Sequence, residues 1–316
     1  MTRADATIGP TLRVRRYLAP VVGPLLPHLP ERWSRAVLAN VLKRCPQLWG
    51  WSSKGDRRSV TRRSYQRAFP HDDARSFMAE VVSGRAHGLA TSAVYIARTQ
   101  AGRDSSLVEP LVLSSAEEMP CVVTYLHCAI DPAMQIALLA SNRRHLFRWV
   151  VFPTQPGEPL RWGGERERAL LLGGRAIPAW ISETLLSVTE PSWPIDALSH
   201  IRQGGSVLIA LDAPLESSRP PGASLRIGRA TMPISPAIDL LARAGGARLL
   251  FVWPERRSDD SWALRCACFA DTTALAAAAS RWIDAHRVAW GGWPYLTWRV
   301  KATELRRIVA DDDATT

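Results

Sequence analysis

Residues 120–132 of this chain are Pro-Cys-Val-Val-Thr-Tyr-Leu-His-Cys-Ala-Ile-Asp-Pro. The run 121–126 is short, apolar and partly β-branched, which is typical of a buried strand. Residues 132–142 have the composition of a helix that begins at a proline. The sequence therefore predicts a strand that ends beside His127, followed by a helix, and a junction of this kind is a place where a site can open.

His127 is followed by Asp131 four positions later, with Cys128, Ala129 and Ile130 between them. An imidazole near its working pKa accepts a proton from a hydroxyl, and a nearby carboxylate fixes its tautomer and stabilises the imidazolium. In a helical segment this separation puts both side chains on one face. The pair is a candidate general base with its orienting acid. The alternative is a half-buried histidine beside an aspartate that starts a helix.

Strand-like and helix-like segments alternate through the rest of the chain. Further strands are expected at 147–153, 206–211, 247–253 and 262–269, and helices at 30–43, 71–99, 179–188, 195–203, 234–244 and 274–288. With 316 residues and 47% hydrophobic residues, the chain is able to bury a large core. The alternation predicts an α/β fold with a mixed sheet flanked by helices.

The order of motifs between about residues 121 and 255 resembles the bacterial lipid A biosynthesis acyltransferase family, within the lysophospholipid acyltransferase superfamily. The motifs are a strand ending in His127, a second strand one helix later, an Arg-rich stretch at 161–168, a Gly turn and strand ending in Asp212, and an apolar-Gly loop at 225–229. One spacing differs, because the family places four residues between the histidine and its acidic partner, whereas three separate them here. The shorter spacing either preserves a contact or marks a relative that has lost the chemistry.

The resemblance implies a lysophospholipid-acyltransferase-like fold and transfer of a fatty acyl group from a thioester to a hydroxyl or amine of a lipid, glycolipid or metabolite. His127 would be the general base, and Asp131 would orient it. The donor would be acyl carrier protein or acyl-coenzyme A, used as a co-substrate. No cofactor and no metal are expected, since thioesters react without one and the sequence has no Cys-x-x-Cys pair with zinc-ligand spacing.

Five further residues are substrate-binding candidates by the same resemblance. Arg166 and Arg168 lie where the family carries a functional arginine, and a guanidinium suits a phosphate or carbonyl oxygen. Asp212 would either bind the acceptor or support the histidine, and Gly228 and Arg229 would border the acceptor's phosphate. The alternatives are arginines that solvate a loop, a turn aspartate and a plain surface turn.

The charge and tryptophan content favour a lipid surface as the partner. The formal net charge is +11, which suits nucleic acid, acidic carrier proteins or anionic lipid surfaces. Three of the 13 tryptophans, Trp33, Trp49 and Trp51, lie among arginines and lysines near the start, a mixture typical of a membrane interface. No nucleic acid is expected, because the sequence has no recognisable DNA- or RNA-binding signature. No segment has the roughly 18 consecutive apolar residues of a spanning helix.

These observations predict two regions. Residues 1–68 are basic and punctuated by proline, and we expect a helical region that docks onto a membrane. Residues 69–316 would form the α/β acyltransferase domain. The five cysteines show no disulfide framework, which suits a reducing compartment. The expected location is the cytoplasmic face of the bacterial inner membrane, in peripheral or monotopic attachment. The rival hypothesis is an inactive relative that binds lipid or a membrane.

Overall fold

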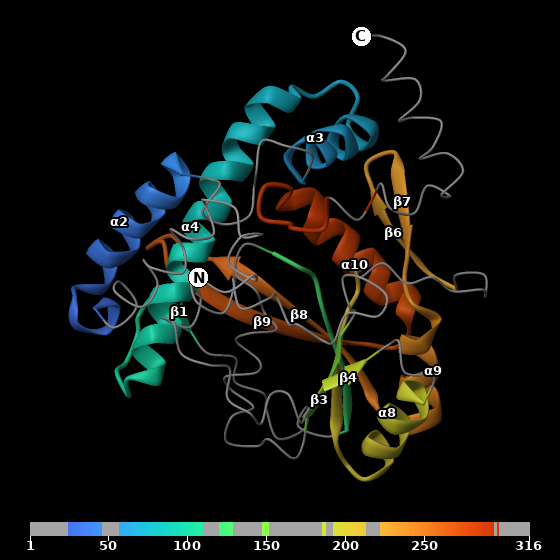
Figure 1. The fold of residues 1–316 in the computed structure, drawn as a ribbon. Coiled ribbons are helices and arrows are strands. Elements are labelled where there is room, and N and C mark those ends of the chain that lie inside the picture. Colours follow the sequence, from blue (N-terminus) through green and yellow to red (C-terminus); the bar gives the residue numbers. More distant parts are fainter. Residues whose placement is uncertain are drawn as a thin grey trace, which may run out of the picture.

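The computed structural model describes residues 25–45, 57–109, 120–128, 147–151, 185–187, 192–212, 222–293 and 296. Seven strands form one sheet in the order β1-β9-β8-β2-β5-β3-β4 (Figure 1). Their bounds are Val108–Glu109 (β1), Cys121–Tyr125 (β2), Phe147–Val151 (β3), Leu185–Ser187 (β4), Ser206–Ala210 (β5), Arg248–Arg256 (β8) and Trp262–Phe269 (β9). All neighbours are parallel except β8 and β9, which makes the sheet mixed.

Helices flank this sheet, and the predicted α/β class with a mixed sheet is confirmed. The α-helices are Glu31–Arg44 (α2), Arg57–Ala68 (α3), Ala74–Gln100 (α4), Trp193–Arg202 (α8), Pro236–Gly245 (α9) and Thr272–Ala285 (α10), with a short 3-10 helix at Leu26–His28 (η1). A separate hairpin, Ser224–Ile227 (β6) and Ala230–Pro233 (β7), packs against α10. No described helix combines the length and apolar character needed to cross a bilayer.

Local sequence explains where two of these helices begin. The Ser235 hydroxyl accepts a hydrogen bond from the Ala237 amide at the start of α9, and Asp271 accepts one from the Ala274 amide at the start of α10. Such N-caps satisfy amides that have no partner within the helix. Both helices were predicted, as were α2, α4 and α8, and their bounds differ from prediction by a few residues at most.

The central strands β2 and β5 are buried along their whole length. Strands covered on both faces are apolar throughout rather than alternating, which is why residues 121–126 lack a polar face. Two side-chain hydroxyls tie this region together. Thr124 donates to the Leu250 carbonyl on β8, and Ser206 accepts from the Cys121 amide. The strand predicted before His127 therefore lies in the middle of the sheet.

The predicted helix at 179–188 is wrong at residues 185–187, which form β4 and pair in parallel with β3. The flanking Thr184, Val188 and Thr189 are β-branched and favour an extended backbone, and Pro191 opposes a helix that continues toward it. Pairing with β3 is a tertiary interaction that the local apolar spacing does not reveal. The predicted helix at 132–142 lies outside the described residues.

The described part of the N-terminal region packs into the same core as the rest of the protein. Leu42, Tyr65 and Ala68 belong to one hydrophobic cluster with residues of the sheet and α10. The Tyr65 ring stacks on Phe77 of α4 and meets Trp293 edge-on. Residues 1–24 and 46–56, including two of the three tryptophans expected at a membrane, lie outside the described residues.

Candidate active site

The register of two parallel strands brings His127 and Asp212 together. Tyr125 at the end of β2 pairs with Ala210 at the end of β5. His127 and Asp212 each lie two residues beyond those partners, so they face each other at the carboxyl edge of the sheet. This edge is where α/β proteins commonly bind ligands, because the loops that follow parallel strands gather there.

The two side chains form a close dyad. His127 Nδ1 lies 2.7 Å from Asp212 Oδ1, and the His127 amide nitrogen lies 3.0 Å from Oδ2. The carboxylate side chain has 0% exposure, whereas the imidazole is 36% exposed. A neutral imidazole that donates Nδ1–H to the carboxylate has its other nitrogen, Nε2, as the proton acceptor. The geometry is that of an oriented general base with its ring partly accessible.

A tryptophan provides a third donor to the carboxylate. Trp290 Nε1 lies 2.8 Å from Asp212 Oδ2, and the Trp290 side chain is fully buried. Asp212 thus receives hydrogen bonds from the His127 amide, the His127 ring and the Trp290 indole. A buried charge is costly unless it is hydrogen-bonded, and these three N–H groups meet that requirement.

Residues 286–293, which we call the strap, run from the end of α10 across the dyad. The Gly291 amide donates to the His127 carbonyl at 2.6 Å, and Trp290 forms an antiparallel bridge with Cys128. The strap therefore contacts the backbone at His127 and at the residue that follows it. The strap was not predicted, although the run Trp-Gly-Gly-Trp at 290–293 after a helix is a signal of close backbone approach.

Arg85 on α4 brings a cation to the same edge. Its Nη1 lies 3.5 Å from the position that a Cβ on Gly291 would occupy, and the His127 carbonyl lies 3.1 Å from that position. Arg85 was not among the predicted site residues. Within the described ranges, no group of three or more His, Cys, Asp or Glu side chains is arranged to hold a metal ion.

The remaining candidates divide into two groups. Asp131, the predicted orienting acid, lies outside the described residues, as do Arg166 and Arg168. Asp212 lies within the described residues. Two roles were predicted for it, acceptor binding and support of the histidine, and its contact with His127 Nδ1 corresponds to the second. A carboxylate beside His127 was thus expected, but the one in the described structure comes from β5 and not from the segment that follows His127.

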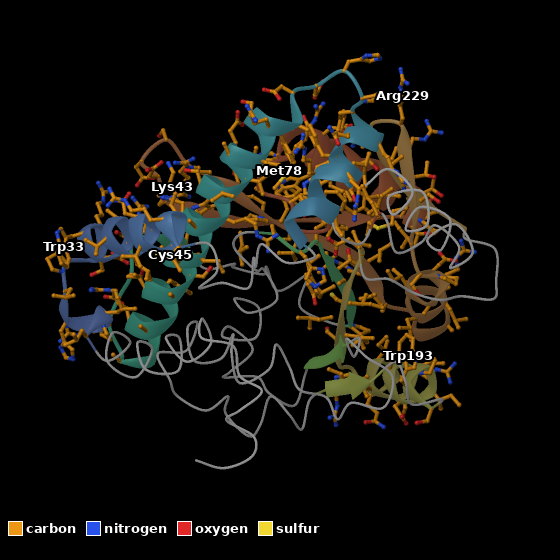
Figure 2. The ribbon with its side chains drawn as sticks, turned by 45° about the horizontal axis from the view of Figure 1, so that its top comes forward. Trp33, Lys43, Cys45, Met78, Trp193 and Arg229 are labelled. Carbon is orange, nitrogen blue, oxygen red and sulfur yellow. The ribbon has the colours of Figure 1, made fainter. Side chains whose placement is uncertain are left out.

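Gly228 and Arg229 form the turn between β6 and β7, where they contact α3. The Arg229 amide donates to the Ala68 carbonyl at 2.9 Å, and the Arg229 guanidinium lies 3.2 Å from His71 Nε2. Figure 2 shows Arg229 at the outer end of this hairpin. Gly228 has a φ of 55°, and an added Cβ would lie 2.3 Å from the Ala68 carbonyl oxygen. A close approach between hairpin and helix accounts for this glycine.

Comparison with known proteins does not identify a relative. No protein-family model matches the sequence, and no curated protein matches it at a significant level. A half-exposed imidazole held by a buried carboxylate is suited to taking a proton from a hydroxyl or amine and returning it to a leaving group.

Proposed function

We propose that the protein is an acyltransferase with a lysophospholipid-acyltransferase-like fold. It moves a fatty acyl group from an acyl thioester to a hydroxyl or amine of a lipid, glycolipid or metabolite. The observation that carries the proposal is the 2.7 Å contact between His127 Nδ1 and the buried Asp212 carboxylate at the carboxyl edge of β2 and β5. The order of motifs along the sequence supports the same reaction.

The proposed reaction needs one proton shuttle. His127 Nε2 takes the proton of the acceptor hydroxyl while the hydroxyl oxygen attacks the thioester carbonyl carbon. The tetrahedral intermediate collapses as the carbon–sulfur bond breaks, and the imidazolium returns the proton to the departing thiolate. The products are an ester, or an amide from an amine acceptor, and a free thiol. Asp212 holds the ring and stabilises the imidazolium, and no covalent enzyme intermediate is required.

The Asp212 contact bears on the short spacing between His127 and Asp131. That spacing motivated the rival hypothesis of an inactive relative, because it departs from the pattern of the resembling family. A carboxylate supplied from β5 orients the histidine whatever Asp131 does. The cation of Arg85 near the His127 carbonyl is suited to a negatively charged oxygen of the intermediate or of a substrate phosphate.

The exposed face of α2 supports an anionic membrane as the partner. Trp33, Val37 and Val41 are spaced four residues apart and are 56%, 42% and 42% exposed. Residues at this spacing share one helix face, and Figure 2 shows Trp33 on the outer side of α2. The exposed cations Arg32 and Lys43 lie on the same helix. An apolar stripe with nearby positive charge is typical of helices that lie in the interface of an anionic bilayer.

The opposite face of α2 packs against α4 and is held by a buried arginine. The Arg35 guanidinium donates to the Asp260 carbonyl at 2.8 Å, in the turn between β8 and β9. The apolar stripe therefore projects from a helix that is already anchored to the body of the protein. We place the protein at the cytoplasmic face of the bacterial inner membrane as a peripheral protein, where a lipid acceptor and a soluble thioester donor meet.

The direct test is transfer of a labelled acyl group from acyl carrier protein and coenzyme A thioesters into total lipid and metabolite extract. We expect product from the wild type, and none from His127→Ala. The control is His28→Ala, an exposed histidine on η1, which should retain activity. A wild-type protein that transfers nothing from either donor, yet binds vesicles, would favour the inactive relative.

Membrane attachment has a separate test. We expect the protein to cosediment with vesicles containing phosphatidylglycerol and much less with pure phosphatidylcholine. Burial of a large apolar side chain is worth about 1.5–3 kcal/mol, so Trp33→Ser should weaken binding roughly tenfold or more. The control is Ile195→Ser on α8, since Ile195 is also apolar and is 70% exposed. Equal binding by both variants and the wild type would exclude α2 as the docking face.

A further inference from the structure

We propose that Trp290 is a positioning residue: its indole N–H fixes the Asp212 carboxylate so that Oδ1 is presented to His127. This inference rests on the proposed acyltransferase function for its kinetic consequence, but its structural core is independent of the reaction. Trp290 contacts neither ring nitrogen of His127 in the described hydrogen bonds. It acts on the base through Asp212.

The geometry divides the carboxylate between two tasks. Oδ1 lies 2.7 Å from His127 Nδ1, while Oδ2 receives the Trp290 indole at 2.8 Å and the His127 amide at 3.0 Å; the same amide lies 3.2 Å from Oδ1. A carboxylate anchored through one oxygen cannot rotate without breaking those bonds. Its other oxygen is therefore held in line with the imidazole, and the tautomer with a proton on Nδ1 is favoured.

The strap holds the indole in place through backbone contacts. Trp290 bridges Cys128, and the Gly291 amide donates to the His127 carbonyl. These contacts join the strap to His127 and to the residue that follows it. A single segment thus controls the position of the base in two ways, through its own backbone and through the carboxylate that orients it.

Aromatic packing fixes the far end of the strap. The Trp290 ring meets the Trp293 ring edge-on at 4.7 Å, and Trp293 also packs edge-on against Tyr65 and Phe77. Trp293 Nε1 donates to the Arg287 carbonyl at 2.9 Å, which closes the strap on itself. Side chains from α3 and α4 thus hold Trp293, and Trp293 in turn packs against Trp290.

The test uses Trp290→Phe, which removes the N–H and keeps most of the aromatic surface. In the wild type at neutral pH we expect a low-field proton NMR signal from His127 Nδ1–H, since that proton is hydrogen-bonded to a carboxylate. Trp290→Phe should broaden or shift this signal. With thioester substrates it should lower kcat roughly 10- to 100-fold with little change in KM, because Trp290 contacts no substrate and outer residues that orient a functional group have effects of this size.

The matched control is Trp262→Phe on β9, outside the strap, where the replaced indole is buried and has no hydrogen-bond partner among the described residues. Its His127 signal and kcat should match the wild type. A second variant, Gly291→Ala, keeps the indole but puts a Cβ 3.1 Å from the His127 carbonyl oxygen, and should also disturb the His127 signal. Gly222→Ala, where an added Cβ meets nothing within 4 Å, is its control.

The outcomes separate the two proposals. A folded Trp290→Phe variant with a wild-type His127 signal overturns the positioning role, whatever the activity. The same result for Gly291→Ala overturns the role of the strap backbone. If the wild type transfers no acyl group but the His127 signal responds to Trp290→Phe, the dyad and its positioning stand while the proposed reaction fails.

Discussion

Replacement of Asp212 by asparagine tests the dyad most directly, because the change keeps the shape of the side chain. Asp212 is fully buried and accepts from three N–H groups, two on His127 and one on Trp290. An amide has one acceptor oxygen, and its NH2 group only donates. In one orientation the NH2 group of the asparagine faces the Trp290 indole and the His127 amide, so donors face donors. In the other it faces His127 Nδ1 and favours the opposite tautomer.

The magnitude follows from these contacts. A hydrogen bond to a charged group contributes about 1.5–3 kcal/mol, and a buried donor left without an acceptor costs a further amount of similar size. We therefore expect Asp212→Asn to lower the free energy of unfolding by about 2–4 kcal/mol. We also expect kcat to fall about 10²- to 10⁴-fold, the range associated with a general base, because the proton now occupies the nitrogen that should receive it.

The assay combines urea unfolding with thioester turnover. Asp239→Asn on α9 is the control, because Asp239 forms a 3.0 Å pair with Arg243 that is largely exposed. Exposed pairs four residues apart on a helix contribute about 0.3–0.5 kcal/mol. If Asp212→Asn unfolds within about 0.5 kcal/mol of the wild type and keeps its turnover within about twofold, the carboxylate neither supports the fold nor orients the base.

Two further predictions concern stability. Burial, followed by the nearby positive charges of Arg35 and Arg256, lowers the pKa of His87 below its usual 6.5. The unfolded chain then binds the proton more tightly, so the contribution of His87 to stability should be constant above about pH 6.5 and should fall as the pH drops below it. Urea midpoints measured across that range should fall less steeply for His87→Met, and parallel curves would contradict the assignment. Gly228→Ala should lower the free energy of unfolding by about 3 kcal/mol or more, because strain at positive φ adds to a clash with α3. Gly102→Ala is the control: its φ is 68° and an added Cβ meets nothing within 4 Å, so it should cost only about 1–2 kcal/mol. Equal losses for the two variants would show that the hairpin does not approach α3 tightly.

Much of the fold follows from local patterns in the sequence. The run 262–269 was predicted as a strand and forms β9 with the same bounds. The helices predicted at 234–244 and 274–288 form α9 and α10 with bounds that differ by two or three residues at most. The strand β4 was missed because three residues carry too little periodicity, and its state depends on pairing with β3. Short elements at the margin of a sheet are set by tertiary contacts rather than by propensity.

The site was predictable only in part. His127 was identified because it follows a strand-like run, and Asp212 because it resembles the aspartate that ends a strand in the acyltransferase family. Their contact depends on the register of β2 against β5, which local sequence does not encode. Trp290 was not foreseen, since nothing near it in the sequence indicates a carboxylate 78 positions earlier. The local sequence thus indicates the candidate base His127, whereas the residues that contact its side chain depend on how the strands pair.

The order of the site residues along the chain has a consequence for biosynthesis. His127 and Asp212 are 85 positions apart, and Trp290 follows another 78 positions later. Contacts between distant residues form late in folding, after the entropy of closing long loops has been paid. A nascent chain must be translated past residue 290 before the three groups can meet. If the protein is an acyltransferase, an incomplete translation product that stops short of the strap should consume thioester more slowly than the whole chain.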